Sequence, residues 1–210
     1  MENFKLAKIA DRLQSMEETI IWRILDRIQY KRNSAIYSTD DIFAKILSPI
    51  NNAHKEFALN ADGRVNLSGE IKEKYQSFLD ISCEAGDDNE YISAAESDFN
   101  VLRAVTKRIY YGAFYVAESK FLSSPKKYAE AIKLCDTAAI ISMLTRRDVE
   151  KKIISRVQEK CKKIQAVYTS KLRRKIDPRL IGDFYKNTII PMTKDGELLY
   201  LFRRDENETD

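Results

Sequence analysis

Apolar residues recur at steps of three and four along much of the chain, which is the spacing that one face of an α-helix presents. The first stripe lies within residues 3 to about 31 and predicts one long amphipathic helix. Its members are Leu6, Ile9, Leu13, Met16, Ile20, Ile24 and Ile28. A single helix cannot bury such a stripe, so we expect several helices that pack against one another.

The composition agrees with this pattern. Only six glycines and four prolines interrupt the 210 residues, which favours long helices over a sheet with many turns. We therefore predict an all-α, multi-helix bundle with three to four long helices, short connecting helices and no sheet. No internal repeat or linker divides the chain, so residues 1–210 are expected to form a single domain.

Polar and turn-forming residues indicate where the other helices begin. Pro125 follows Ser124 at an N1-like position, and Asp177 precedes Pro178 in the same way as an N-cap residue precedes N1. The segment from Thr145 to Asp148 resembles a capping box, and Pro191 predicts a kink because it lacks a backbone donor. The expected helices are residues 40–57 (interrupted near Pro49), 67–81, 93–121, one from 124, 145–172 and 177–204, with a solvated acidic loop at 84–90.

The charge balance excludes little by itself. The chain has 36 basic and 32 acidic residues, and a formal charge of +4 is too small to imply nucleic-acid or membrane binding. The N-terminus has no apolar signal-like region, and no stretch approaches the roughly 18 apolar residues that a membrane span needs. Three cysteines without metal-ligand or redox spacing are typical of reduced thiols, so we expect a cytoplasmic protein.

The usual catalytic motifs are nearly absent. The chain has one histidine, His54, no glycine-rich phosphate loop and no cysteine with an obvious histidine partner. A structural role for His54 is favoured over a role as ligand or base. Nucleophilic catalysis is therefore not expected, and the acidic loop at 84–90 lacks the regular ligand spacing of a calcium site.

Two cations lie on an otherwise apolar and aromatic predicted helix, Arg108 and Lys120. Burial of a guanidinium and an ammonium is costly unless an anion meets them, so this segment either exposes its charged ends to solvent or holds an acidic ligand. Twelve residues at about 100° each place the two side chains roughly 120° apart on a straight helix. The helix must therefore be distorted if both cations contact one ligand.

Glu150, Thr193 and Glu197 are the other polar residues that stand out, although helical charges are usually solvated. The segments around all five residues, together with Met16-Glu-Glu-Thr-Ile-Ile-Trp-Arg-Ile-Leu-Asp-Arg27, resemble the all-α chorismate mutases of fungi and plants. The matching segments are residues 16–27, 108–121, 149–153 and 190–204, in that order, whereas residues 58–90 match poorly.

The resemblance implies an isomerase that converts chorismate to prephenate in phenylalanine and tyrosine biosynthesis. This Claisen rearrangement is unimolecular and needs no cofactor, which explains the missing catalytic motifs. By similarity, Arg108 binds a substrate carboxylate and Lys120 reaches the ether oxygen and a carboxylate. Glu150 accepts the ring hydroxyl, Thr193 adds a polar contact, and a protonated Glu197 faces the ether oxygen. A homodimer is also implied, and the long apolar stripes are consistent with one.

The chain departs from the family pattern at three places. The family has an arginine at the position of Ala10, which here is flanked by Lys8 and Arg12. Arg146 stands where the family often has Asn or Asp, and this cation at a helix start is either a solvated arginine or a further candidate substrate ligand. Eleven residues separate the two helix cations in the family pattern. We therefore expect the extra residue to form a π-bulge around Gly112 to Tyr115.

Fungal relatives bind tyrosine and tryptophan through an Arg-Arg pair and a Gly-Ser segment. Ala58 and Leu59 occupy the arginine positions, and Ile92-Ser93 replaces Gly-Ser, so we expect little control by these amino acids.

The alternative functions are a mutase paralogue that has lost turnover, or a noncatalytic helical protein. The latter would bind nucleic acid or an acidic partner through the basic cluster Lys171, Arg173, Arg174 and Lys175.

Overall fold

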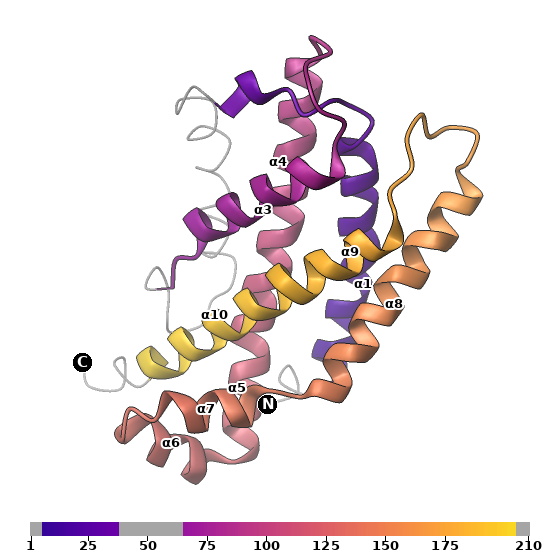
Figure 1. The fold of residues 1–210 in the computed structure, drawn as a ribbon. Helices are drawn as coiled ribbons and strands as arrows, with labels where there is room; N and C mark the ends of the chain where they lie inside the picture. Colours follow the sequence, from indigo (N-terminus) through magenta and orange to yellow (C-terminus); the bar gives the residue numbers. More distant parts are fainter. Residues whose placement is uncertain (1–5, 38–64, 205–210) are drawn as a thin grey trace.

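A computed structural model of the chain describes residues 6–37 and 65–204. These residues form helices and no strand, so the predicted all-α architecture is confirmed (Figure 1). None of the described helices is long and apolar enough to cross a bilayer. The helix expected over residues 40–57 and the positions of His54, Ala58 and Leu59 lie outside the described residues.

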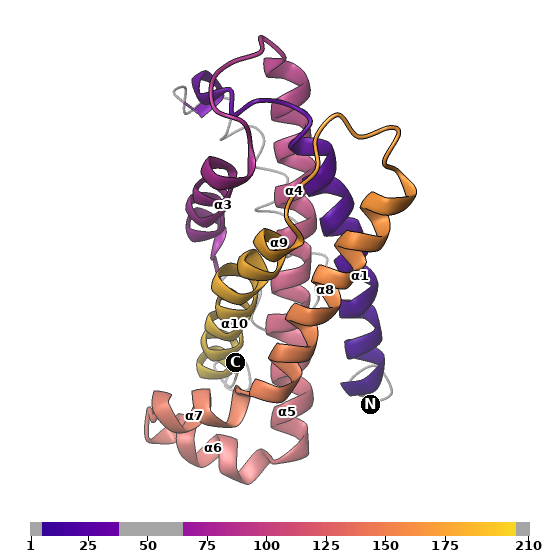
Figure 2. The ribbon, with the colours of Figure 1, turned by 45° about the vertical axis from the view of Figure 1, so that its right-hand side comes forward.

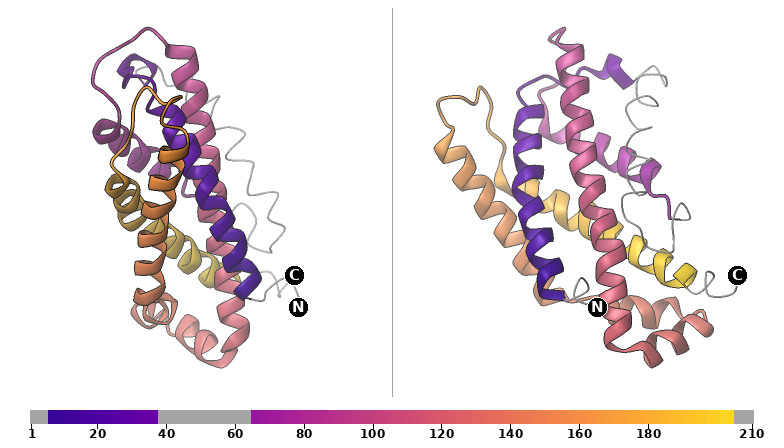
Figure 3. Two further views of the ribbon diagram at one scale, coloured as in Figure 1. Left: turned by 90° about the vertical axis from the view of Figure 1, so that its right-hand side faces the viewer. Right: turned by 180° about the vertical axis from the view of Figure 1, so that it is seen from behind.

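The first long helix, α1 (Leu6–Arg27), lies antiparallel to α4 (Tyr91–Tyr111), and the two are seen side by side in Figure 3. Arg27 at the end of α1 donates to Asp98 in the second turn of α4 at 2.6 Å, and neither side chain is exposed. The Arg27 guanidinium also donates to the carbonyls of Lys31 at 3.0 Å and Arg32 at 3.1 Å. These bonds hold a chain reversal, and α1 therefore ends before the expected residue 31.

The helix expected over residues 93–121 is continuous but not uniformly α-helical. α4 leads into a π-helix, η4 (Gly112–Val116), and then into α5 (Ala117–Ser123). Pro125 opens α6 (Pro125–Lys133) as predicted, and a separate helix, α7 (Thr137–Leu144), follows after Asp136 caps it by accepting from the Ala139 amide. These short helices form one end of the molecule (Figure 1).

The third long helix, α8 (Arg147–Val167), lies beside α1 (Figure 2). The capping-box prediction for its start was wrong. Arg146 is the N-cap residue, in place of Thr145, and its side chain makes no capping bond. The Thr145 hydroxyl instead donates to the Ile141 carbonyl at the end of α7 at 2.8 Å. α8 ends at Val167, before the expected residue 172. Just beyond this end, the Thr169 hydroxyl donates to the Gln165 carbonyl.

The last long element crosses the bundle diagonally in Figure 1 and has three parts, α9 (Pro178–Phe184), the π-helix η5 (Tyr185–Ile189) and α10 (Ile190–Arg203). Asp177 caps α9 as predicted, because its carboxylate accepts from the Arg179 amide at 2.9 Å. The irregularity expected at Pro191 lies in the turn before it. Proline cannot donate to the carbonyl four residues earlier, so the α-helical ladder is interrupted there.

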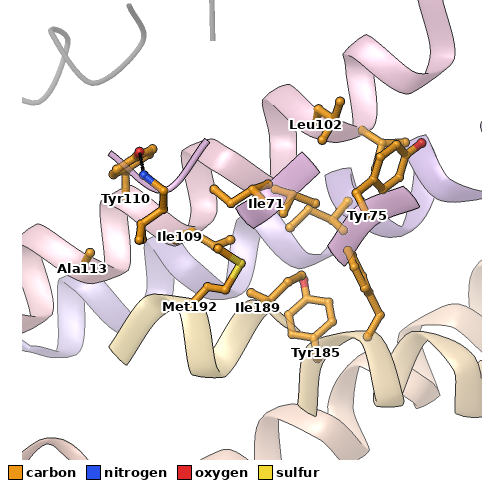
Figure 4. Packing of buried hydrophobic residues seen from close by; sticks show 14 of the residues in the cluster. Ile71, Tyr75, Leu102, Ile109, Tyr110, Ala113, Tyr185, Ile189 and Met192 are labelled. Carbon is orange, nitrogen blue, oxygen red and sulfur yellow. Dashed lines mark hydrogen bonds between the residues drawn. The ribbon is translucent and has the colours of Figure 1, made fainter. Parts of the chain in front are cut away.

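The shorter α3 (Ser68–Ser82) agrees with the helix predicted over residues 67–81, and it packs on α4. The short 3-10 helix η2 (Ser34–Tyr37) precedes the undescribed segment, and residues 84–90 form a loop as expected. Figure 4 shows the core where α3, α4 and the last helix meet. Its labelled members include Ile71, Leu102, Ile109, Ile189 and Met192, all nearly or fully buried.

Candidate active site

The two helix cations line one cavity. Arg108 lies in the last turn of α4 and Lys120 in α5, and the π-helix Gly112–Val116 separates them. A π-helix accommodates one extra residue, so the distortion offsets the rotation that a straight helix would impose over twelve residues. The predicted π-bulge is therefore confirmed at its predicted position.

The cavity has a volume of about 320 Å³ and lies between α1, the α4 to α5 helix, α8 and α10. Its lining contains six cationic side chains and three carboxyl groups, so positive charge is in excess. The cations are Arg108, Lys120, Arg146, Lys152, Arg156 and Lys194, and the carboxyl groups are Glu17, Glu150 and Glu197. Such a cavity can bind a small molecule with more than one negative charge.

Arg108 is the most deeply buried of these cations, with 4 % of its surface exposed. Its Nε and Nη1 atoms make no hydrogen bond to the described residues, and burial lowers the pKa of the guanidinium. A buried cation with free N–H groups binds a carboxylate strongly, since the cost of removing it from water has already been met in folding.

Two glycines bring the π-helix η4 close to α10. A Cβ atom on Gly112 would lie 2.6 Å from Cγ2 of Thr193, and one on Gly196 would lie 2.7 Å from Cβ of Ala113. Both distances are too short for real atoms, so these positions require glycine with the helices as they stand. The close approach places Thr193 and Glu197 of α10 on the same cavity as Arg108 and Lys120.

Glu197 and Lys120 form a largely buried pair at the cavity wall. The Lys120 ammonium donates to the Leu144 carbonyl at 2.6 Å and to Oε2 of Glu197 at 3.3 Å. Glu197 is 4 % exposed, and burial raises its pKa to about 7 although the Lys120 charge acts in the opposite direction. The carboxyl group can therefore be protonated, and act as a donor, near neutral pH.

Glu150 and Thr193 also line the cavity. Glu150 accepts from the Lys194 ammonium at 2.7 Å, and about a quarter of each of these two side chains is exposed. The Thr193 hydroxyl donates to the Ile189 carbonyl at 2.7 Å, so its oxygen lone pairs remain available to a ligand. All five residues of the predicted constellation and Arg146 thus meet at one cavity, drawn from three separate parts of the chain.

Of the three cations considered as replacements for the family arginine, Lys8, Arg12 and Arg146, one lines the cavity. Ala10 lines the cavity, and so does the exposed Arg146 at the start of α8. Lys8 does not line it, and Arg12 lies in a different groove together with Lys107 of α4.

Sequence reasoning missed four charged groups of the cavity, Lys152, Lys194, Glu17 and Arg156, and the last two form an ion pair. Glu17 is 1 % exposed and accepts from Nε of Arg156 at 2.8 Å, and Lys160 also contacts its carboxylate at 3.2 Å. The available signal was the position of Glu17 on the α1 face that also carries Ala10 and Leu13.

A larger hollow of about 570 Å³ lies over η2 and the start of α4. Its lining is apolar apart from Glu96, and it carries no cation among the described residues. The described residues also contain no group of three metal-ligating side chains. The chemistry of a charged ligand is therefore concentrated at the smaller cavity.

No family model matches the sequence. The chain is 28% identical to the chorismate mutase of Pichia angusta, over 98% of this chain and 89% of the relative. The cytosolic chorismate mutase 2 of Zea mays and the chloroplastic chorismate mutase 1 of Arabidopsis thaliana are also among the similar proteins.

Solved structures agree with these similarities. The Aro7p chorismate mutase of Candida albicans in complex with L-Trp superposes with a TM-score of 0.85 at 26% identity, over 98% of this chain and 93% of that one. AtCM1 with tyrosine bound in its allosteric site superposes with a TM-score of 0.75 at 30% identity, over 95% of this chain and 96% of that one. The order of helices, the charged cavity and these relatives together place the chain in the all-α chorismate mutase family of fungi and plants, whose members are intramolecular isomerases.

Proposed function

We propose that this protein converts chorismate to prephenate at the cavity that Arg108 and Lys120 share. The observation that carries the proposal is the excess of cations in that cavity, including the buried Arg108 with hydrogen-bond donors still free. Chorismate is a dicarboxylate ether, so its two negative charges match this excess. Its rearrangement needs a compact conformer and stabilisation of charge on the breaking ether oxygen.

Each predicted site residue has a role that its position supports. Arg108 binds one carboxylate bidentately, and Lys120 reaches from the Leu144 carbonyl toward the ether oxygen and a carboxylate. Arg146 binds the second carboxylate from the mouth of the cavity. Thr193 offers its hydroxyl oxygen from α10, and Glu150, which Lys194 orients, accepts the ring hydroxyl.

Glu197 makes the reaction dependent on pH. The group has a raised pKa of about 7, so it is protonated below that pH and donates a hydrogen bond to the ether oxygen. As the pH rises through this pKa the carboxylate forms, the donor is lost and the new charge repels the developing oxyanion. The two carboxylates of the substrate raise the pKa further in the complex.

We therefore expect kcat of the wild type to fall as the pH rises. In Glu197→Gln, kcat should stay constant between about pH 6 and 9, because the amide donates a hydrogen bond at every pH in that range. Turnover measured across this range in both proteins checks the assignment. An alkaline limb of the same shape in the mutant would remove Glu197 from this role.

We propose little control by tyrosine or tryptophan. The hollow beside Ile92 contains no cation among its described lining residues, so an amino-acid carboxylate would find no cationic partner among them. Ile92 itself is 86 % exposed.

We also infer a homodimer, which the exposed apolar side chains Tyr91 and Ile92 over this hollow support. We further infer a single domain, because one core draws on helices from α1 to α10.

The test is the loss of chorismate absorbance with purified protein, with and without tyrosine or tryptophan. Robust turnover that neither amino acid changes supports the proposal, and a clear effector response contradicts the regulatory part. No turnover together with binding of a transition-state analogue indicates a mutase paralogue that has lost activity. Binding of neither molecule favours a noncatalytic helical protein. The cytoplasmic location that the three free thiols suggest is tested by fractionation of cells.

A further inference from the structure

Tyr185 is a buried polar side chain that the proposed reaction does not use. None of its surface is exposed, and its hydroxyl makes no hydrogen bond to the described residues. Figure 4 shows it projecting from the segment before α10 into the core, beside Ile189. A sealed hydroxyl without a partner costs free energy, and phenylalanine would fill the same space without that cost. The hydroxyl therefore requires an explanation outside the packing of the free protein.

Arg108 has buried donors that lack an acceptor, whereas Tyr185 has a buried hydroxyl that lacks any partner among the described residues. Its guanidinium carries five N–H donors in a rigid fork, and Nε and Nη1 are sealed without an acceptor. A substrate carboxylate takes the donors that face the cavity, and the others need an acceptor on the protein side. Tyr185 is not among the residues that line the cavity, yet it interacts electrostatically with Arg108. η5, which carries Tyr185, packs on α4, which carries Arg108, so the hydroxyl is a buried acceptor in the same part of the core as the buried donors.

The Tyr185 hydroxyl also has a candidate acceptor for its own hydrogen bond. Glu17 interacts electrostatically with Tyr185, and its carboxylate accepts from Arg156 and Lys160. A carboxylate has about four acceptor positions, so one more donor can be accommodated. Burial holds the pKa of Tyr185 above its usual range, and the group stays a neutral phenol that accepts and donates at once.

We propose that Tyr185 is a positioning residue for Arg108 in the substrate complex. This inference rests on the proposed function. When a carboxylate of the substrate enters, the guanidinium turns toward it, one of its sealed N–H groups donates to the Tyr185 oxygen, and the Tyr185 hydroxyl donates to Glu17. The resulting chain of hydrogen bonds connects the substrate to α4, η5, α1 and α8. It fixes the orientation of the fork that must meet the carboxylate.

Tyr185→Phe tests this role, with Tyr75→Phe as a matched control. Both tyrosines are fully buried, but the Tyr75 hydroxyl already donates to Asp98 at 2.7 Å, in the core away from the cavity. We expect Tyr185→Phe to lower kcat/KM for chorismate about tenfold while Tm stays the same or rises. We expect the opposite in Tyr75→Phe, with a lower Tm and an unchanged kcat/KM.

A double-mutant cycle shows whether the effect acts through Arg108. In an Arg108→Lys background, which has no fork to orient, Tyr185→Phe should change kcat/KM by less than about twofold. An unchanged kcat/KM in Tyr185→Phe, the same tenfold loss in the Arg108→Lys background, or an equal loss in Tyr75→Phe would each overturn the inference.

The inference and the proposed function fail in different ways. If the wild type does not convert chorismate, the function fails, and calorimetry with the prephenate dianion then decides the positioning role. Weaker binding to Tyr185→Phe than to the wild type supports that role, and equal binding contradicts it. No binding of prephenate by the wild type overturns both.

Discussion

Arg108→Met is expected to lower kcat/KM for chorismate by about a thousandfold and, at the same time, to raise the stability of the free protein. Arg108 is 4 % exposed and two nitrogens of its guanidinium lack acceptors in the described part of the chain, so folding removes a charge from water with little compensation. Methionine fills similar space without that cost, which corresponds to about 1–3 kcal/mol and several degrees in Tm. The site thus holds a buried cation with hydrogen-bond donors that are unpaired among the described residues of the free protein.

Thermal unfolding and initial rates measured on the same preparations check this expectation. The matched control is Arg27→Met, which removes a buried arginine whose charge is paired with Asp98. That variant should lose about 3–5 kcal/mol of stability, because the Asp98 carboxylate stays buried without its partner. A drop in Tm for Arg108→Met as large as that for Arg27→Met would show that Arg108 is a structural residue.

Lys120→Ala should likewise reduce kcat by about a thousandfold, with a smaller change in KM. The Leu144 carbonyl holds its ammonium at 2.6 Å, so the charge is already oriented toward the cavity before the substrate binds. A preoriented cation stabilises the oxyanion of the transition state more than the ground state. Loss of Lys120 also removes the charge that opposes protonation of Glu197, so any remaining activity should extend to higher pH.

The control for this variant is Lys126→Ala, which removes an exposed lysine from α6 near the same end of the molecule. Its rate should equal that of the wild type. A residual kcat within about tenfold of the wild type in Lys120→Ala would contradict a role at the ether oxygen, because loss of an oriented donor typically costs about a hundred- to a thousandfold.

Part of this behaviour could be predicted from local patterns. The three- and four-residue periodicity predicted the helices, and Pro125 and Asp177 indicated two of their starts correctly. Helix ends were less predictable. Arg27 stops α1 by binding carbonyls beyond it, and the Thr145 hydroxyl bonds backward to α7 instead of capping α8. In both cases the partners of one side chain set the helix boundary, and the periodicity of the sequence does not show those partners.

By resemblance to a family, the sequence pointed to the five residues that we propose bind the substrate. By itself it determined the helical class of this protein and the extra residue that becomes the π-helix Gly112–Val116. These are local properties, because periodicity and spacing act within one helix. The tertiary structure alone decided that Glu17 and Arg156 join the cavity, that Lys8 and Arg12 stay outside it, and that the pKa of Glu197 rises to about 7. Those outcomes depend on burial between helices that are distant in sequence, and the cost of burying a charge is set by its neighbours in space.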